Sequence, residues 1–133
     1  MLKILGIIKH QIRLRASLRR EKKKAKTRSP RWPRVEKQAL FAHPTCAGCG
    51  SRLHLQVHHK KPFHSFPQLE LEPTNLIVMC MSATECHLRI GHGDHFRAFN
   101  PNVELDAAAS LRNPESRPSI WAKAKAARVI NAG

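Results

Sequence analysis

Four cysteines in two closely spaced groups are the feature that most constrains what this chain can fold into. Two residues separate Cys46 from Cys49, and five separate Cys80 from Cys86. Thiolates at two short spacings on separate segments are what a closed tetrahedral zinc site requires, and Gly48 lets the backbone turn tightly around a metal. The sequence therefore predicts that Cys46, Cys49, Cys80 and Cys86 hold a structural Zn²⁺ ion.

Other uses of these cysteines remain open. They would form two disulfides in a secreted protein, but the sequence shows no typical signal peptide, which favours a reduced, metal-binding role. The gap between Cys80 and Cys86 exceeds the usual spacing of about two to four residues. The alternative is that Cys80 or Cys86 is a buried apolar thiol that binds no metal. The longest apolar run near the start, residues 4–8, is far shorter than the roughly 20 residues of a membrane-spanning helix, so we expect no membrane association.

Positive charge is concentrated ahead of the first cysteine. The chain has 24 Lys and Arg against 9 Asp and Glu, a formal net charge of +15, and residues 1–45 contain 14 of those bases with 2 Glu. Such an excess favours a polyanionic partner, and DNA is the one we expect. A merely solubilising charge run is the alternative. The candidate phosphate contacts in this arm are Lys22, Lys23, Lys24 and Lys26.

Apolar periodicity and turn residues predict a small α+β protein in three parts. Residues 1–30 form a basic amphipathic helix and linker, 31–100 a metal-binding module, and 101–133 a helical C-terminal extension. Trp32, between two prolines, is expected to be a packing anchor. Within the module and its extension, the predicted elements are a helix over 35–42, a strand over 53–57 leading into His58 and His59, a second strand over 76–79, a helix over 83–90 and a helix over 119–130.

The histidines supply candidates for a second function, because a four-cysteine zinc site has no open coordination position. His58 and His59 are adjacent at a strand end, so their side chains point to opposite sides and suit different tasks. One would bind a divalent ion and the other would accept a proton from water. On a helix, His87 diverges from Cys86 by about 100°, so it can face a second metal. As its partner, His92 is preferred to His95, provided that the helix ends at residue 91.

Four segments together resemble the HNH endonucleases, specifically the small phage and bacterial type with cysteine pairs around a ββα-metal (His-Me finger) motif. The resemblance extends from Trp32 to Asn100. It implies a metal-dependent enzyme that hydrolyses DNA phosphodiester bonds in the cytoplasm of a bacterial or phage-infected cell. The matching segments are HPTCAGCG at 43–50, VHHKKPF at 57–63, PTNLIVMC at 73–80 and CHLRIGH at 86–92.

The resemblance also implies a role for each site residue. His58 and His87 would bind the catalytic Mg²⁺, Mn²⁺ or Ni²⁺, with His92 as a possible third ligand. His59 would be the general base, and Asn75 would orient it by holding the loop between the strands. The cysteines would bind the structural zinc. Beside the base, Lys60 and Lys61 are candidate contacts for the DNA backbone, and surface solvation accounts for them equally well.

Two other functions compete with the nuclease. A non-catalytic zinc protein that binds nucleic acid accounts equally well for the charge and the cysteines, but it does not explain the order of His58, His59, Asn75 and His87. A basic organellar or ribosome-associated protein with an imported presequence would also begin with an acid-free, Arg-rich stretch. Outside the nuclease, Asn75 is simply a turn residue.

Overall fold

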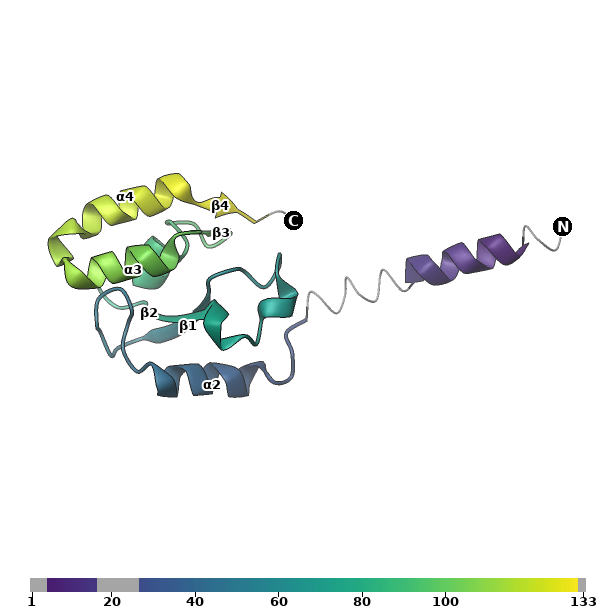
Figure 1. Ribbon diagram of the computed structural model, residues 1–133, viewed down its shortest axis with the longest axis horizontal. Coiled ribbons are helices and arrows are strands. Elements are labelled where there is room, and N and C mark those ends of the chain that lie inside the picture. The colour runs from purple at the N-terminus through teal and green to yellow at the C-terminus, as the bar shows by residue number, and fades with distance from the viewer. Residues whose placement is uncertain (1–4, 17–26, 132–133) are drawn as a thin grey trace.

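The chain folds into a small mixed α/β protein with two short antiparallel sheets, here described from a computed structural model (Figure 1). The structure describes residues 5–16 and 27–131. Lys22, Lys23, Lys24 and Lys26 therefore lie outside the described residues. Residues 5–16 form a helix whose side chains are all exposed. Within the described ranges, none of the helices has the length and apolar character needed to cross a membrane.

The first sheet is a hairpin of β1 (Leu55–His59) and β2 (Leu76–Cys80), in which His59 pairs with Leu76 and Leu55 with Cys80. The strand predicted over 53–57 is displaced by two residues, so both histidines belong to the strand itself. His54 explains the displacement, because its φ of 51° lies in the left-handed region and interrupts extended chain. The hairpin register sets His58 opposite Ile77.

Helix α2 (Trp32–Ala42) packs against both strands of this hairpin. It begins three residues before the predicted helix, with a proline in its first turn. Proline is tolerated there because a first-turn residue has no intrahelical partner for an N–H group. The helix ends before Pro44, as expected, because proline disfavours helical geometry in the residue before it.

The predicted helix over 83–90 is wrong in its extent. Only η3 (His87–Gly91) is helical, and it is wound as a π-helix. Glu85 has φ 45°, which stops a regular helix from starting earlier. At the other end, the His92 amide donates to the carbonyls of His87 and Leu88, both at 3.2 Å, so an i→i+5 bond closes the turn.

The C-terminal helices share their core with the rest of the protein. Helix α3 (Val103–Arg112) and helix α4 (Arg117–Ala127) pack against each other and against η3. The helix predicted over 119–130 is observed as α4 and ends three residues early, at Ala127. The chain then forms β4 (Val129–Ile130), which pairs with β3 (Ala98–Phe99) as the second sheet. One buried cluster joins both sides of residue 100, and its members are Cys46, Met79, Cys80, Cys86, Ile90, Val103, Ala107 and Ile120.

Buried polar contacts attach α3 to the rest of the module. The Asn100 side chain donates to Asp106 at 2.8 Å and to the Ile90 carbonyl at 3.0 Å. The Ser110 hydroxyl donates to the Gly48 carbonyl at 2.7 Å. Because these groups are buried, leaving any of them unpaired would cost free energy, so the bonds fix α3 against both η3 and the cysteine turn.

We expect Gly93→Ala to destabilise the fold. Gly93 has φ 57°, and an added Cβ would lie 2.7 Å from the Ala124 carbonyl of α4. The clash and the left-handed backbone together predict a loss of more than about 1 kcal/mol in the free energy of unfolding. Thermal melting measures this loss. Gly6→Ala is the matched control because nothing lies within 4 Å of its Cβ position; equal melting temperatures for the two variants would contradict the assignment.

Candidate metal centres

Cys46, Cys49, Cys80 and Cys86 come together, with sulfur atoms within 4.8 Å of one another. Two of them flank a tight turn, one ends β2, and Cys86 immediately precedes η3. Four sulfur ligands at this separation could bind one metal ion and are compatible with a zinc site. Gly48 makes the approach possible, because a Cβ there would lie 3.0 Å from the Cys86 sulfur.

The longer cysteine gap forms a loop that itself contacts the sulfurs. A bond of 2.9 Å from the Glu85 amide to the Ser82 carbonyl closes this loop. Thr84, inside the loop, donates its hydroxyl hydrogen to the Cys49 sulfur at 3.1 Å. Two backbone amides, those of Gly48 and Cys80, donate to the Cys46 sulfur at 3.3 Å each. Hydrogen bonds to thiolates of this kind orient metal ligands.

The sulfurs of Cys46 and Cys86 share a proton unequally. The hydrogen bond with Cys86, helped by backbone N–H groups, lowers the pKa of Cys46 to about 4. The same bond, with burial, raises the pKa of Cys86. These opposite pKa shifts favour loss of the Cys46 proton before that of Cys86, and a bound cation would favour deprotonation of both.

A second cluster consists of His58, His87 and His92. Each offers a ring nitrogen within 4.8 Å of the others. His58 comes from β1, His87 begins η3, and His92 follows it. The π-helical turn explains how His92 reaches the cluster, because its i→i+5 bond returns the chain to His87 and brings the two Nε2 atoms to 3.2 Å. Exposed His95 is not a member of this cluster.

Hydrogen bonds engage the outer nitrogens of two of these rings. Nδ1 of His87 donates to the Gln56 side-chain oxygen, and Nδ1 of His92 donates to the Ala98 carbonyl, both at 2.7 Å. In a neutral imidazole, the other nitrogen then has only a lone pair. Nε2 of His58 is buried with no hydrogen-bond partner. Because buried nitrogens normally have a partner, these three rings fit a bound cation.

Burial keeps the three rings neutral, as metal ligands must be. Burial is the main cause that lowers the pKa of His58 well below its usual value, with repulsion from His92 and His87 adding to it. It also lowers the pKa of His87 to about 4, and that of His92 to a smaller extent. A metal at this position would therefore meet little competition from protons near pH 7.

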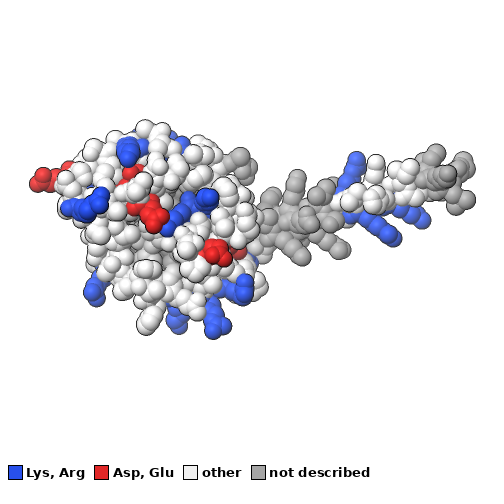
Figure 2. Space-filling model, in the orientation of Figure 1, with Lys and Arg blue, Asp and Glu red and all other residues white. Residues whose placement is uncertain are grey.

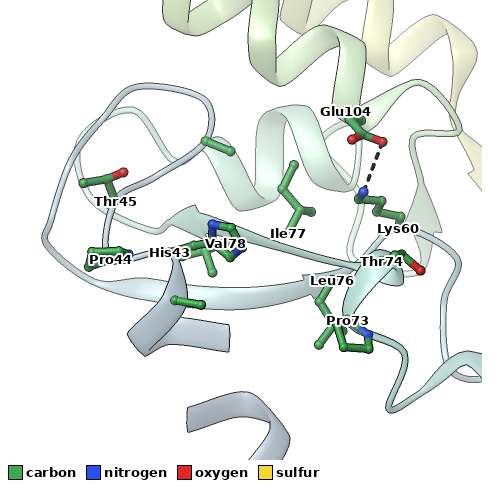
Figure 3. A pocket seen from close by; sticks show the side chains of 12 residues that line it. His43, Pro44, Thr45, Lys60, Pro73, Thr74, Leu76, Ile77, Val78 and Glu104 are labelled. Atoms are coloured by element: carbon green, nitrogen blue, oxygen red, sulfur yellow. Dashed lines mark hydrogen bonds and ion pairs between the residues drawn. The ribbon is translucent and has the colours of Figure 1, made fainter. Parts of the chain in front are cut away.

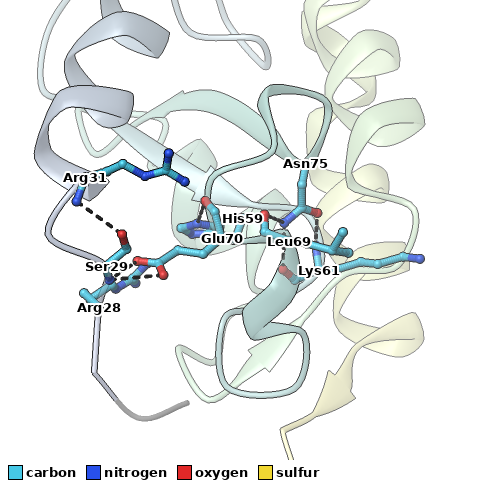
Figure 4. Close-up of polar contacts among 8 residues, drawn as sticks. All are labelled: Arg28, Ser29, Arg31, His59, Lys61, Leu69, Glu70 and Asn75. Carbon is cyan, nitrogen blue, oxygen red and sulfur yellow. Dashed lines mark hydrogen bonds and ion pairs between the residues drawn. The ribbon is translucent and has the colours of Figure 1, made fainter. Parts of the chain in front are cut away.

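His59 lies outside the histidine cluster and has a different environment. Its Nε2 donates to the Glu70 carbonyl at 2.9 Å (Figure 4), which leaves the lone pair on Nδ1. Its ring stacks on Trp32, with centroids 4.6 Å apart. Burial is the largest effect lowering the pKa of His59, and the nearby Arg28 guanidinium acts in the same direction.

Asn75 holds both ends of the loop that follows His59. Its side-chain oxygen accepts from the Lys61 amide at 2.9 Å, and its side-chain nitrogen donates to the carbonyls of Lys61 and Leu69 (Figure 4). Its own carbonyl accepts from the Lys60 amide at 2.8 Å. The loop in turn presents the Glu70 carbonyl to His59, so Asn75 and His59 are joined through one backbone segment.

The segment immediately before α2 closes over His59. The Arg28 guanidinium lies over two rings, Trp32 at 5.0 Å and Phe63 at 4.8 Å, and is 3.9 Å from the Glu70 carboxylate. That carboxylate also accepts from the Ser29 amide at 3.1 Å. The role of Trp32 as a packing anchor thus extends to the candidate base. No sequence pattern marks Arg28 and Glu70, which come together from distant segments.

The predicted lysine contacts are partly engaged within the protein. Lys60 forms an ion pair with Glu104 at 3.0 Å and lines a hollow of about 710 Å³ beside β2 (Figure 3). The walls of this hollow include none of the cysteines and none of the clustered histidines. Lys61 lies over the Phe66 ring at 5.5 Å. Other Lys and Arg side chains are spread over the visible face and the N-terminal helix (Figure 2).

Gln56 and the Ala98 carbonyl are site groups that the sequence analysis missed. Gln56 was detectable in principle, because residues i and i+2 of a strand face the same side, and it precedes His58 by two. The Ala98 carbonyl was not detectable, because any residue supplies the same group. Its position depends on how the chain returns after η3.

Comparisons of the chain with protein-family models, with curated proteins and with solved structures gave no match. The resemblance to HNH endonucleases therefore depends on the four sequence motifs alone.

We expect the two clusters to bind metal independently. His87→Ala should lower the zinc content of zinc-saturated protein by one ion per chain and leave the melting temperature nearly unchanged, because His87 is only partly buried. Cys46→Ser should abolish cooperative folding, since structural zinc stabilises small modules by about 10 kcal/mol or more. Elemental analysis and thermal melting provide the two readouts. His95→Ala, which changes an exposed histidine, is the control and should keep the wild-type zinc content. Unchanged zinc content in His87→Ala would contradict a metal site at the histidines.

Asn75→Ala should loosen the loop that supports His59. The change removes three buried hydrogen bonds and leaves backbone groups of Lys61 and Leu69 unpaired, at a cost of about 1–3 kcal/mol. Amide hydrogen exchange should accelerate at residues 60–72 more than in α3. Asn102→Ala, which removes an exposed side chain, is the control. Equal exchange in the two variants would show that Asn75 does not hold the loop.

Proposed function

We propose that this protein is a metal-dependent HNH endonuclease that hydrolyses DNA phosphodiester bonds. The observation that carries the proposal is the convergence of a ring nitrogen from each of His58, His87 and His92. His59, the residue after His58 in β1, is held separately by the Glu70 carbonyl. A purely structural cluster would gain nothing from leaving the buried Nε2 of His58 without a partner.

The order of elements supports the proposal. β1, β2 and η3 follow one another as strand, strand and helix, which is the order of the ββα-metal motif. His58 and His59 end the first strand, Asn75 precedes the second, and His87 begins the helix. The family's residue order thus coincides with a spatial arrangement that its chemistry can use.

The histidine cluster differs from the cysteine cluster in what it can do. Four sulfur ligands complete a tetrahedral shell, whereas three nitrogens leave at least one position open for substrate oxygen. A divalent cation bound there would supply charge neutralisation at the scissile phosphate. His58, His87 and His92 would hold it, and Gln56 and the Ala98 carbonyl would fix two of the rings.

His59 would act as the general base. Its Nδ1 would take the proton of the attacking water, because Nε2 is engaged by the Glu70 carbonyl. Stacking against Trp32 restricts rotation of the ring. The neutral state favoured by burial is the one that can accept a proton near pH 7.

DNA is the proposed substrate because the chain has a formal net charge of +15. Each phosphate neutralised by Lys or Arg contributes affinity that does not depend on sequence and that falls with salt. A zinc protein that only binds nucleic acid would share this property. It would leave the three histidine nitrogens and the separately held His59 without a role, so we favour the nuclease.

The decisive test is cleavage of supercoiled plasmid in Mg²⁺, Mn²⁺, Ni²⁺ or EDTA. We expect cleavage by the wild type that EDTA abolishes, and a fall of about 10²- to 10⁴-fold in rate for His59→Ala, the usual contribution of a general base. His64→Ala, which changes an exposed histidine in the following loop, is the control. Shifted but intact plasmid with every ion would support the binding protein instead.

A further inference from the structure

Phe96 is an exposed aromatic ring at the rim of the histidine cluster. Its side chain is 59% exposed. Its ring centroid lies 5.2 Å from that of His92 and 6.4 Å from that of His87. One edge of the ring thus contacts the cluster while much of it faces solvent.

The loop that presents Phe96 is fixed at several points. The Asp94 amide donates to the Leu88 carbonyl at 3.0 Å, and the Ala98 amide to the His95 carbonyl at 2.7 Å. From the C-terminal segment, Arg128 donates to the Gly93 carbonyl at 2.8 Å and the Asn131 amide to the Arg97 carbonyl at 2.7 Å. These hydrogen bonds fix the turn in a conformation that exposes the Phe96 side chain.

The residues on each side of Phe96 suit a nucleotide. His95 and Arg97 are both exposed. No carboxylate of the described residues forms an ion pair with Arg97. An exposed aromatic residue followed in the chain by an exposed arginine suits a base joined to a phosphate, because bases stack on aromatic rings and phosphates bind arginine.

We propose that Phe96 is a stacking platform for a nucleobase of the nucleic acid that the histidine cluster would act on. This inference rests on the proposed function and adds the form of its substrate. The 5.2 Å between the ring centroids of Phe96 and His92 would bring a base stacked on Phe96 close to a phosphate held at the cluster. A base in that position has left its duplex neighbours, so the site favours single-stranded or locally opened DNA.

The test compares three substitutions that separate stacking from packing. Phe96→Ala removes the ring, Phe96→Leu keeps an apolar group against His92, and Phe96→Trp keeps a larger aromatic face. The affinity for a fluorescently labelled single-stranded oligonucleotide is measured by anisotropy in zinc-loaded protein without an added activating ion. Alanine and leucine should each weaken binding by about 5- to 150-fold, the range that loss of one stacked base gives, and tryptophan should bind at least as tightly as wild type.

Two controls accompany these variants. Phe41→Ala removes a ring that is 89% exposed on α2, away from the cluster, and should leave affinity unchanged. A strand of the same length that is abasic throughout should bind wild type and Phe96→Ala with equal affinity, because no base remains to stack on the ring. Zinc content should equal that of wild type in every Phe96 variant.

Several results would overturn the inference. These are wild-type affinity in Phe96→Leu, loss of a zinc ion in Phe96→Ala, or no binding of single-stranded DNA by the wild type. The proposed function fails separately. If plasmid stays intact with every ion while the Phe96 variants follow the expected order, stacking stands and hydrolysis does not. If His59-dependent cleavage occurs and Phe96 variants bind and cut as wild type, only the stacking platform is wrong.

Discussion

The structure depends on the convergence of candidate metal ligands, most of them buried or partly buried, around one short turn. Cys86 ends the loop that completes the four-sulfur cluster, and the next residue, His87, begins the turn that brings His92 to the nitrogen cluster. Several of the sulfurs share hydrogen bonds with one another or with Thr84, and the sulfurs would repel one another if all were ionised. The buried Nε2 of His58 has no partner. A cation in each cluster would offset this repulsion and satisfy that nitrogen, and at the cysteines its binding would be coupled to the packing of the core.

The C-terminal helices supply what the hairpin and η3 lack, which is enough apolar surface to hold the clusters in place. Val103, Ala107 and Ile120 complete the buried cluster, and Ser110 and Asp106 bind groups next to the cysteines and η3. A substitution in α3 should therefore disturb the candidate metal ligands without contacting them, because it weakens the packing and hydrogen bonds that hold them. The same support fixes the loop that carries Phe96. The proposed nuclease thus places its chemistry on a hairpin and a single turn, and its rigidity on the helices behind them.

Much of the site was predictable because it depends on local spacing. The cysteine groups, the adjacency of Cys86 and His87, and the preference for His92 over His95 all followed from residues near each other in sequence. The positive φ angles of His54 and Glu85 were not predictable, because neither residue type demands that conformation. They displace β1 and shorten the helix. The contacts of Arg28, Trp32 and Glu70 around His59 join distant segments, and no local pattern reports such contacts.

The central claim is that the three histidines form a metal site distinct from the cysteines. Anomalous X-ray diffraction from crystals of protein loaded with two equivalents of zinc tests it most directly. The account predicts two peaks, one about 2.3 Å from each of the four sulfurs and one about 2.0–2.1 Å from a ring nitrogen of His58, His87 and His92. A single peak at the sulfurs, with the three rings unchanged and no density between them, would contradict it.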